Sequence, residues 1–160
     1  MDLAARAAGV AAVLKEKKWT VSVAESSAGG LISAALLAVP GASAYYVGGG
    51  VIYTRHVRRA LLGLTDDAIK ARGSTEAYAL LLAQTMRQKL DTTWAVGETG
   101  AAGPTGTRYG HPPGYSCIAV TGPVERVITL ETGSADREAN MWRFADAAFE
   151  LFRKAMAEAG

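Results

Sequence analysis

Two short segments of this 160-residue chain combine hydroxyl side chains with glycines. The first is ESSAGG at residues 25–30, and the second is the glycine-rich stretch at residues 97–106. A serine at the start of a helix can cap it or present a nucleophile, and free N–H groups there can hold an anion. Glycines let a ligand approach the backbone closely. The residue types also allow the first segment to be a simple capped helix and the second to be an ordinary turn.

Neither segment carries a common nucleotide or hydrolase motif. The chain lacks GxGxxG, the GK[ST] ending of a phosphate-binding loop, and the GxSxG turn of α/β-hydrolases. His56 and His111 lie far apart and outside any HExxH pattern, and a single cysteine, Cys117, builds neither a disulfide nor a multi-Cys metal site. We therefore expect no metal, no cofactor and no Ser-His-Asp hydrolase.

Charge and composition narrow the class further. The net charge is 17 − 15 = +2, and 49% of residues are hydrophobic. So small a charge gives no strong reason to expect a nucleic-acid or membrane partner. The basic residues around Arg58 favour either one bound anion or a solvated helix face. The sequence shows no export signal or membrane-spanning segment, so we expect a cytoplasmic protein.

Helical and β-type segments alternate along the chain. We predict helices over about residues 2–17, 28–39, 55–62, 75–89 and 135–160, and strands over about residues 20–24, 45–54, 92–96, 115–121 and 124–130. This order predicts one three-layer α/β/α domain over residues 1–160, with a mostly parallel sheet and one antiparallel hairpin. Because ESSAGG and the glycine-rich stretch each follow a predicted strand, we expect them to form two walls of one pocket.

Further patterns predict packing. The glycine triplet at residues 48–50 indicates a bulge or a close backbone approach within a strand. Cys117 and the three tryptophans are typical of core or interface positions. Arg137, at the start of the last helix, opposes the helix dipole, so we expect it to be exposed or to have an anionic partner.

Four segments occur in a characteristic order: AESSAGG, PGASAYYVGGGVIYTRHVRRALLGL, GETGAAGPTG and residues 133–137. Together they resemble the carboxy-terminal domain of the CinA family, the nicotinamide-nucleotide amidases, whose usual strings are AESCTGG, PGSS and TGIAGP. The resemblance covers nearly the whole chain, which looks like a stand-alone version of that domain. It implies hydrolysis of the carboxamide of nicotinamide mononucleotide to nicotinic acid mononucleotide and ammonia, in pyridine-nucleotide salvage.

The resemblance also implies roles for individual residues. The implied catalytic residues are Ser26 as nucleophile, Tyr53, Arg58 and Thr99. The implied substrate-binding residues are Ser27, Gly29, Gly30, Gly100, Gly103 and Arg137. The helix start at Ser26 would supply backbone donors for the oxyanion. The resemblance further implies a homo-oligomer, and we expect the apolar face of the first helix to contribute to self-association.

Three residues depart from the family pattern: Ala28 replaces a threonine, Glu98 stands beside Thr99, and Arg58 replaces a lysine. We expect Glu98 either to pair with Arg58 or to face solvent. A guanidinium does not release its proton, so Arg58 either leaves the enzyme slow or supplies only charge while Tyr53 takes the proton from Ser26. We expect the second scheme. The alternative function is a nucleotide-binding module with little or no hydrolysis.

Overall fold

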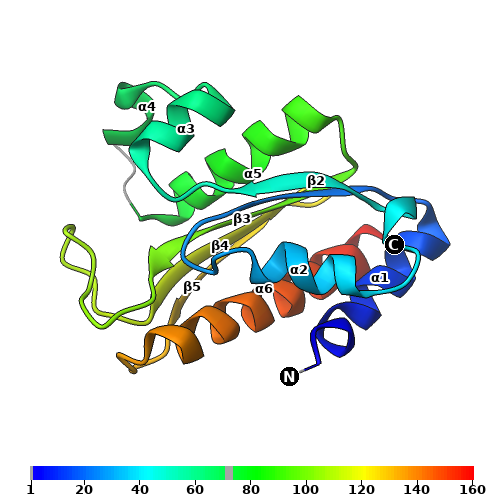
Figure 1. Cartoon of the computed structure of the whole chain (residues 1–160). Coiled ribbons are helices and arrows are strands. Elements are labelled where there is room, and N and C mark those ends of the chain that lie inside the picture. Colours follow the sequence, from blue (N-terminus) through cyan, green and yellow to red (C-terminus); the bar gives the residue numbers. More distant parts are fainter. Residues whose placement is uncertain (1, 71–73) are drawn as a thin grey trace.

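The computed structural model describes residues 2–70 and 74–160, which form a three-layer α/β/α structure (Figure 1). The strands are β1 (Val21–Glu25), β2 (Tyr46–Val51), β3 (Trp94–Ala101), β4 (Tyr115–Thr121) and β5 (Arg126–Glu131). The helices are α1 (Leu3–Lys17), α2 (Leu31–Ala38), the short 3-10 helix η1 (Ala42–Ala44), α3 (Arg55–Leu62), α4 (Asp66–Lys70), α5 (Glu76–Leu90) and α6 (Arg137–Ala159).

The five strands form one sheet in the order β2-β1-β3-β4-β5. Strand β1 runs parallel to β2 and to β3, whereas β4 pairs antiparallel with both β3 and β5. Four strands therefore point the same way and only β4 is reversed, which confirms the mostly parallel sheet and the predicted hairpin. The added antiparallel pairing of β3 with β4 was not predicted.

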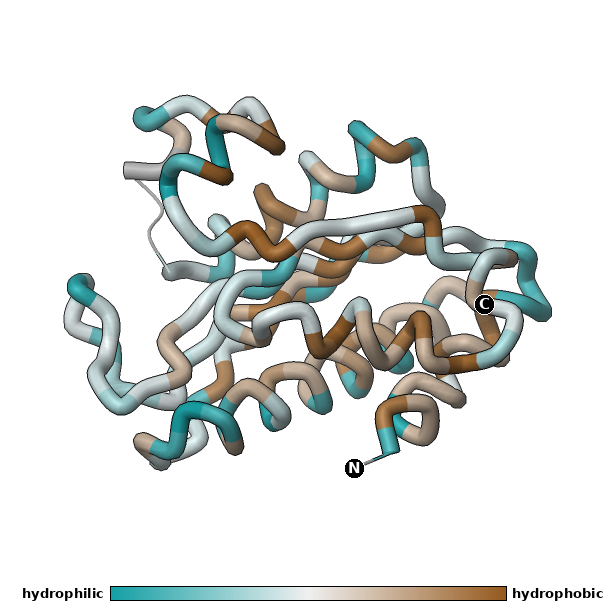
Figure 2. Tube along the Cα trace, viewed as in Figure 1, coloured by the Kyte–Doolittle hydropathy of each residue, from teal (hydrophilic) through white to brown (hydrophobic). Residues whose placement is uncertain are grey.

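Helices cover both faces of the sheet. Helices α1, α2 and α6 enclose the larger core, where Trp94 packs edge-on against Trp19 and Phe152. Helix α5 covers the other face, and hydrophobic segments concentrate between the layers (Figure 2). Trp94 and Cys117 are fully buried, as expected. The apolar face of α1 is also buried in this core, so it cannot serve self-association as we expected.

Strand β3 is longer than predicted, because residues 97–101 belong to the strand instead of a loop. Gly97 pairs with Ala119, and Gly100 pairs with Ser116. A Cβ on Gly97 would lie 2.2 Å from the carbonyl oxygen of Ala79, so glycine is what lets α5 lie against the sheet here. The glycines that suggested a loop are thus sites of close packing.

The glycine triplet in β2 behaves as predicted. A Cβ on Gly49 would lie 2.3 Å from the carbonyl oxygen of Val23, and the pairing of β1 with β2 shifts register between Val21 and Ser22. The neighbouring strands therefore approach closely at this point.

The starts of α2 and α5 bear on the site. Helix α2 begins at Leu31 instead of residue 28, which leaves residues 26–29 as a turn after β1. Thr75 caps α5 by accepting a hydrogen bond from the Tyr78 amide at 3.1 Å, so Ser74 lies just outside the helix. The short helix α4 was not predicted. None of the described helices is both long and apolar enough to cross a bilayer.

Candidate functional site

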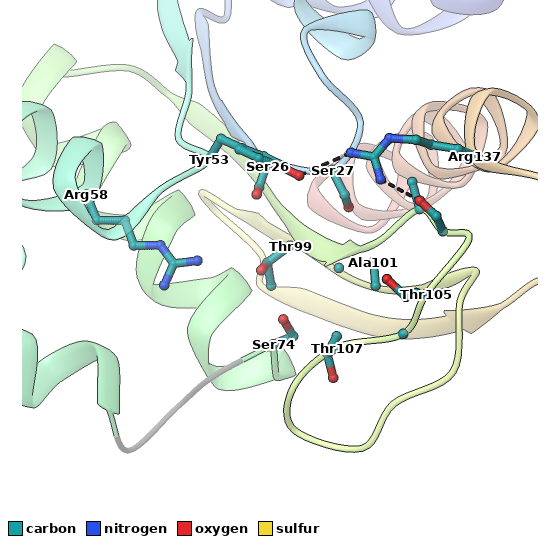
Figure 3. A pocket seen from close by; sticks show the side chains of 14 residues that line it. Ser26, Ser27, Tyr53, Arg58, Ser74, Thr99, Ala101, Thr105, Thr107 and Arg137 are labelled. Atoms are coloured by element: carbon teal, nitrogen blue, oxygen red, sulfur yellow. Dashed lines mark hydrogen bonds between the residues drawn. The ribbon is translucent and has the colours of Figure 1, made fainter. Parts of the chain in front are cut away.

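A pocket of about 340 Å³ opens at the carboxyl ends of β1 and β3 (Figure 3). Both segments singled out in the sequence contribute to its walls, as their positions after strands predicted. Its lining consists of Ser26, Ser27, Tyr53, Arg58, Ser74, Thr99, Gly100, Ala101, Ala102, Gly103, Thr105, Gly106, Thr107 and Arg137.

The pocket brings together all four residues expected to be catalytic and four of the six expected to bind substrate. The other two, Gly29 and Gly30, lie at the start of α2 outside this lining. Both have positive φ values, of +69° and +100°, which glycine adopts without strain. The structure therefore gives these two glycines a role in shaping the turn.

The turn that carries Ser26 is held from beneath by Glu98. This carboxylate is fully buried and accepts hydrogen bonds from the backbone N–H groups of Ser26 at 3.0 Å and Ala28 at 2.8 Å. It also accepts from the hydroxyls of Ser27 and, at 2.8 Å, Ser116. Glu98 thus neither pairs with Arg58 nor faces solvent, and our expectation was wrong because the turn supplies enough donors to hold a buried carboxylate.

A second buried carboxylate, Glu25, occupies the N-terminus of α2. It accepts from the amides of Gly30, Ile32 and Ser33 at 2.9, 3.1 and 2.9 Å. Burial raises the pKa of this carboxyl group, although hydrogen bonds from the Ser33 and Ile32 amides act in the opposite direction.

Amides at the start of α2 therefore already donate to protein carboxylates. The residue types left open that this helix start holds an anion, and the resemblance implied that it supplies oxyanion donors. That expectation fails for the bonded amides, among them those of Ser26 and Ala28, because Glu98 and Glu25 occupy them.

The two pocket arginines have different partners. Arg137 donates to the Tyr53 hydroxyl at 3.1 Å and to the Gly103 carbonyl oxygen, and Figure 3 shows it reaching Tyr53. Both of these hydrogen-bond partners are neutral, not the anionic partner that was one of the two expectations for Arg137. The guanidinium of Arg58 lies 4.7 Å from the centre of the Tyr78 ring, and its buried Nε has no hydrogen-bond partner among the described residues. The cation bonded to Tyr53 is therefore Arg137.

Tyr78 supports Arg58 from inside the fold. Its side chain is fully buried, and within residues 2–70 and 74–160 its hydroxyl has no hydrogen-bond partner. Burial raises the pKa of Tyr78 to about 12, against an opposing effect of Arg58. The neutral phenol ring therefore offers its face to the cation.

The lining is rich in hydroxyl groups and carries two guanidinium groups. Among the residues that the structure describes, no Asp, Glu or His side chain lines the pocket, and none of the described His, Cys, Asp and Glu residues cluster as metal ligands would. The pocket can thus attract a polar anion and offers a serine hydroxyl as a nucleophile.

Sequence reasoning missed several of these residues. Ser74, Thr105 and Thr107 line the pocket. Glu98 and Tyr78 lie outside the lining and contact the lining residues Ser26 and Arg58. The threonines stand in the glycine-rich segment, which is a signal that could have been used. Nothing local in the sequence indicates that Glu98 faces the turn at Ser26, because 71 positions separate it from Ser27.

Comparison with known proteins gives a consistent result. The model of the CinA C-terminal domain matches residues 3–156. A CinA-like protein of Salinibacter ruber is 36% identical over 144 residues, covering 89% of this chain and 35% of that protein. A CinA-like protein of Desulforapulum autotrophicum is 35% identical over 150 residues, with coverage of 92% and 35%. The chain thus spans about a third of the length of these curated relatives.

Solved structures share the fold. The competence/damage inducible protein CihA of Agrobacterium tumefaciens superposes with a TM-score of 0.89 at 26% identity, covering 97% of this chain and 96% of that one. A CinA superfamily protein of Klebsiella pneumoniae reaches a TM-score of 0.91 at 22% identity, covering 99% of both chains. The family match along nearly the whole sequence, on a fold that these structures share, shows that the chain belongs to the CinA C-terminal domain family.

Proposed function

We propose that this protein hydrolyses the carboxamide of nicotinamide mononucleotide, giving nicotinic acid mononucleotide and ammonia. The observation that carries the proposal is the pocket itself, where Ser26, Tyr53 and Thr99 meet two guanidinium groups. Amide hydrolysis of this kind needs an attacking oxygen, a proton carrier and donors for the developing oxyanion. The pocket contains a group suited to each task.

In this proposal the Ser26 hydroxyl attacks the carboxamide carbon. Its proton passes to the Tyr53 oxygen while the phenol gives its own proton to the departing nitrogen, so the C–N bond breaks and ammonia leaves. Water then attacks the acyl group on Ser26, which releases the carboxylate product and restores the serine. The Ser26 and Ala28 amides donate to Glu98, so they do not serve the oxyanion. Thr99 and Arg58, which also line the pocket, stabilise it instead.

The substrate phosphate is assigned to the other wall of the pocket. Arg137 lines the pocket together with two threonines of the glycine-rich loop, Thr105 and Thr107. A guanidinium and hydroxyl groups are suitable donors for phosphate oxygens. The carboxylates of Glu98 and Glu25 at the start of α2 would repel the substrate phosphate. This arrangement orients the carboxamide toward Ser26.

The alternative function is a nucleotide-binding module that hydrolyses little or nothing. Arg58 favours it, because a guanidinium at this place cannot act as a proton acceptor. Both functions predict that nicotinamide mononucleotide binds, and only the first predicts that product forms.

The test combines ammonia release with calorimetry on the purified protein. We expect chelator-insensitive ammonia release from nicotinamide mononucleotide that is lost in Ser26→Ala. Ser22→Ala provides a matched control, because Ser22 is also a buried serine of the β1 region and bonds only to Thr92 among described side chains. Binding without ammonia release above the Ser26→Ala level would instead identify a binding module.

A further inference from the structure

We propose that Glu98 is a positioning residue that holds Ser26 in its reactive place through the length of its side chain instead of through its charge. The inference rests on the proposed function only in taking Ser26 as a nucleophile. Its evidence is the set of bonds that joins the end of β3 to the turn after β1.

The two oxygens of Glu98 have separate tasks. Oε2 accepts the backbone N–H groups of Ser26 and Ala28, on either side of Ser27. Oε1 accepts the hydroxyls of Ser27 and Ser116. The first oxygen thus fixes the backbone of the turn, and the second is itself fixed by β4. These bonds restrain the backbone at Ser26.

The position of Glu98 in β3 also relates Ser26 to Thr99. Successive side chains of a strand point to opposite faces of the sheet. Glu98 therefore reaches the turn on the α2 side, while Thr99 enters the pocket from the α5 side, where its strand partner is Cys117. One short piece of β3 sets the place of both hydroxyl groups, and this makes Glu98 important for chemistry as well as for folding.

The contacts indicate that reach matters more than charge. Glu98 forms no ion pair with any described Lys or Arg, and its four partners are all N–H or O–H donors. A glutamine can meet the same partners, because its carbonyl oxygen can face the two amides and its NH₂ can face the two hydroxyls, which also accept. An aspartate keeps the charge but is one methylene shorter.

The experiment compares Glu98→Gln with Glu98→Asp in the full chain. One readout is the rate at which a fluorophosphonate probe labels Ser26, followed by mass spectrometry, and the others are kcat and KM for nicotinamide mononucleotide. We expect Glu98→Gln to label within about tenfold of wild type. We expect Glu98→Asp to lose about 10²-fold in labelling rate and kcat, as a displacement of about 1 Å can cause, with KM little changed.

Ser22→Ala controls for loss of stability, because it removes a buried hydroxyl contact to Thr92 without touching the turn. It should lower the melting temperature while leaving the labelling rate unchanged. Equal labelling of Glu98→Asp and wild type would overturn the proposal, as would equal damage in Glu98→Gln and Glu98→Asp or a wild type that the probe does not label at Ser26. A wild type that labels but releases no ammonia would contradict the proposed amidase alone.

Discussion

The two walls of the pocket, the turn after β1 and the loop after β3 with Arg137, differ in burial and in hydrogen bonding. The turn after β1 is buried, and amides of this region donate to Glu98 and Glu25. The loop after β3 is largely exposed, and its Thr105 and Thr107 line the pocket together with Arg137. In the first wall, buried carboxylates hold the backbone amides, whereas in the second wall a guanidinium and two threonines line the pocket from an exposed loop and the start of α6.

This difference suits the first wall to holding the nucleophile and the second wall to binding the substrate phosphate. A nucleophile needs a fixed position, and the hydrogen bonds of a buried side chain of the right length provide it. A ligand phosphate needs accessible donors, which an internally bonded helix start no longer offers. We therefore expect damage to the first wall and to Tyr53 to lower kcat, and damage to the second wall to raise KM.

The largest effect is expected at Tyr53, which lines the pocket and accepts a hydrogen bond from Arg137 of the second wall. Tyr53→Phe removes the proposed proton carrier, and we expect kcat to fall about 10²- to 10⁴-fold, as for other general acid–base groups. KM should change little. Steady-state ammonia release measures both, with Tyr109→Phe on the exposed part of the loop as a control. A fall of kcat no greater than that of the control would remove Tyr53 from the mechanism.

A smaller effect is expected from the recognition wall. Arg137→Gln removes the guanidinium that bonds Tyr53 and Gly103, and we expect KM to rise about 10- to 100-fold, the value of one or two charge-assisted hydrogen bonds. Arg143→Gln, on the same helix, should leave KM near wild type. If both substitutions raise KM equally, general attraction by positive charge accounts for binding.

Arg58→Lys should change kcat by only about a few fold, because a lysine keeps the positive charge that the proposed mechanism requires. The loss of the planar stacking on Tyr78 accounts for a modest decrease. The measurement is kcat for the single variant beside Tyr53→Phe. A large gain in Arg58→Lys together with near-normal Tyr53→Phe would show that a lysine here takes the proton instead.

The smallest effect concerns Glu25, beside the first wall, and the pH dependence of the free energy of unfolding. Burial raises the pKa of Glu25 above its ordinary value of 4.5, so the folded state holds this proton more tightly than the unfolded state does. The resulting contribution to stability is present below that value and is lost as pH rises through the folded-state pKa.

Denaturant unfolding of wild type and Glu25→Gln from about pH 4 to about pH 7 measures this contribution. The free energy of unfolding of wild type, minus that of the variant, should decrease as the pH rises. A constant difference would show that the amide hydrogen bonds to Glu25 balance its burial, and an increasing difference would show that they outweigh it.

Local patterns were enough where neighbours in sequence set the structure. The helix over Arg55–Leu62 and the strand over Tyr115–Thr121 have the predicted bounds. Their capping residues, periodicity and β-branched residues act over a few positions. The prediction failed at residues 97–101, because glycine normally indicates a loop but here permits close approach of α5 and β4.

The sequence alone determined the fold class, the two segments that form the pocket walls, and the presence of Ser26, Tyr53, Arg58 and Thr99 as candidates. Only the tertiary structure decided which groups these residues meet. Glu98 reaches the turn at Ser26 from a distant strand, and Arg137 bonds Tyr53 across 84 positions. Such pairings depend on strand order and helix placement, and buried charges adopt whichever partners the assembled layers bring within reach.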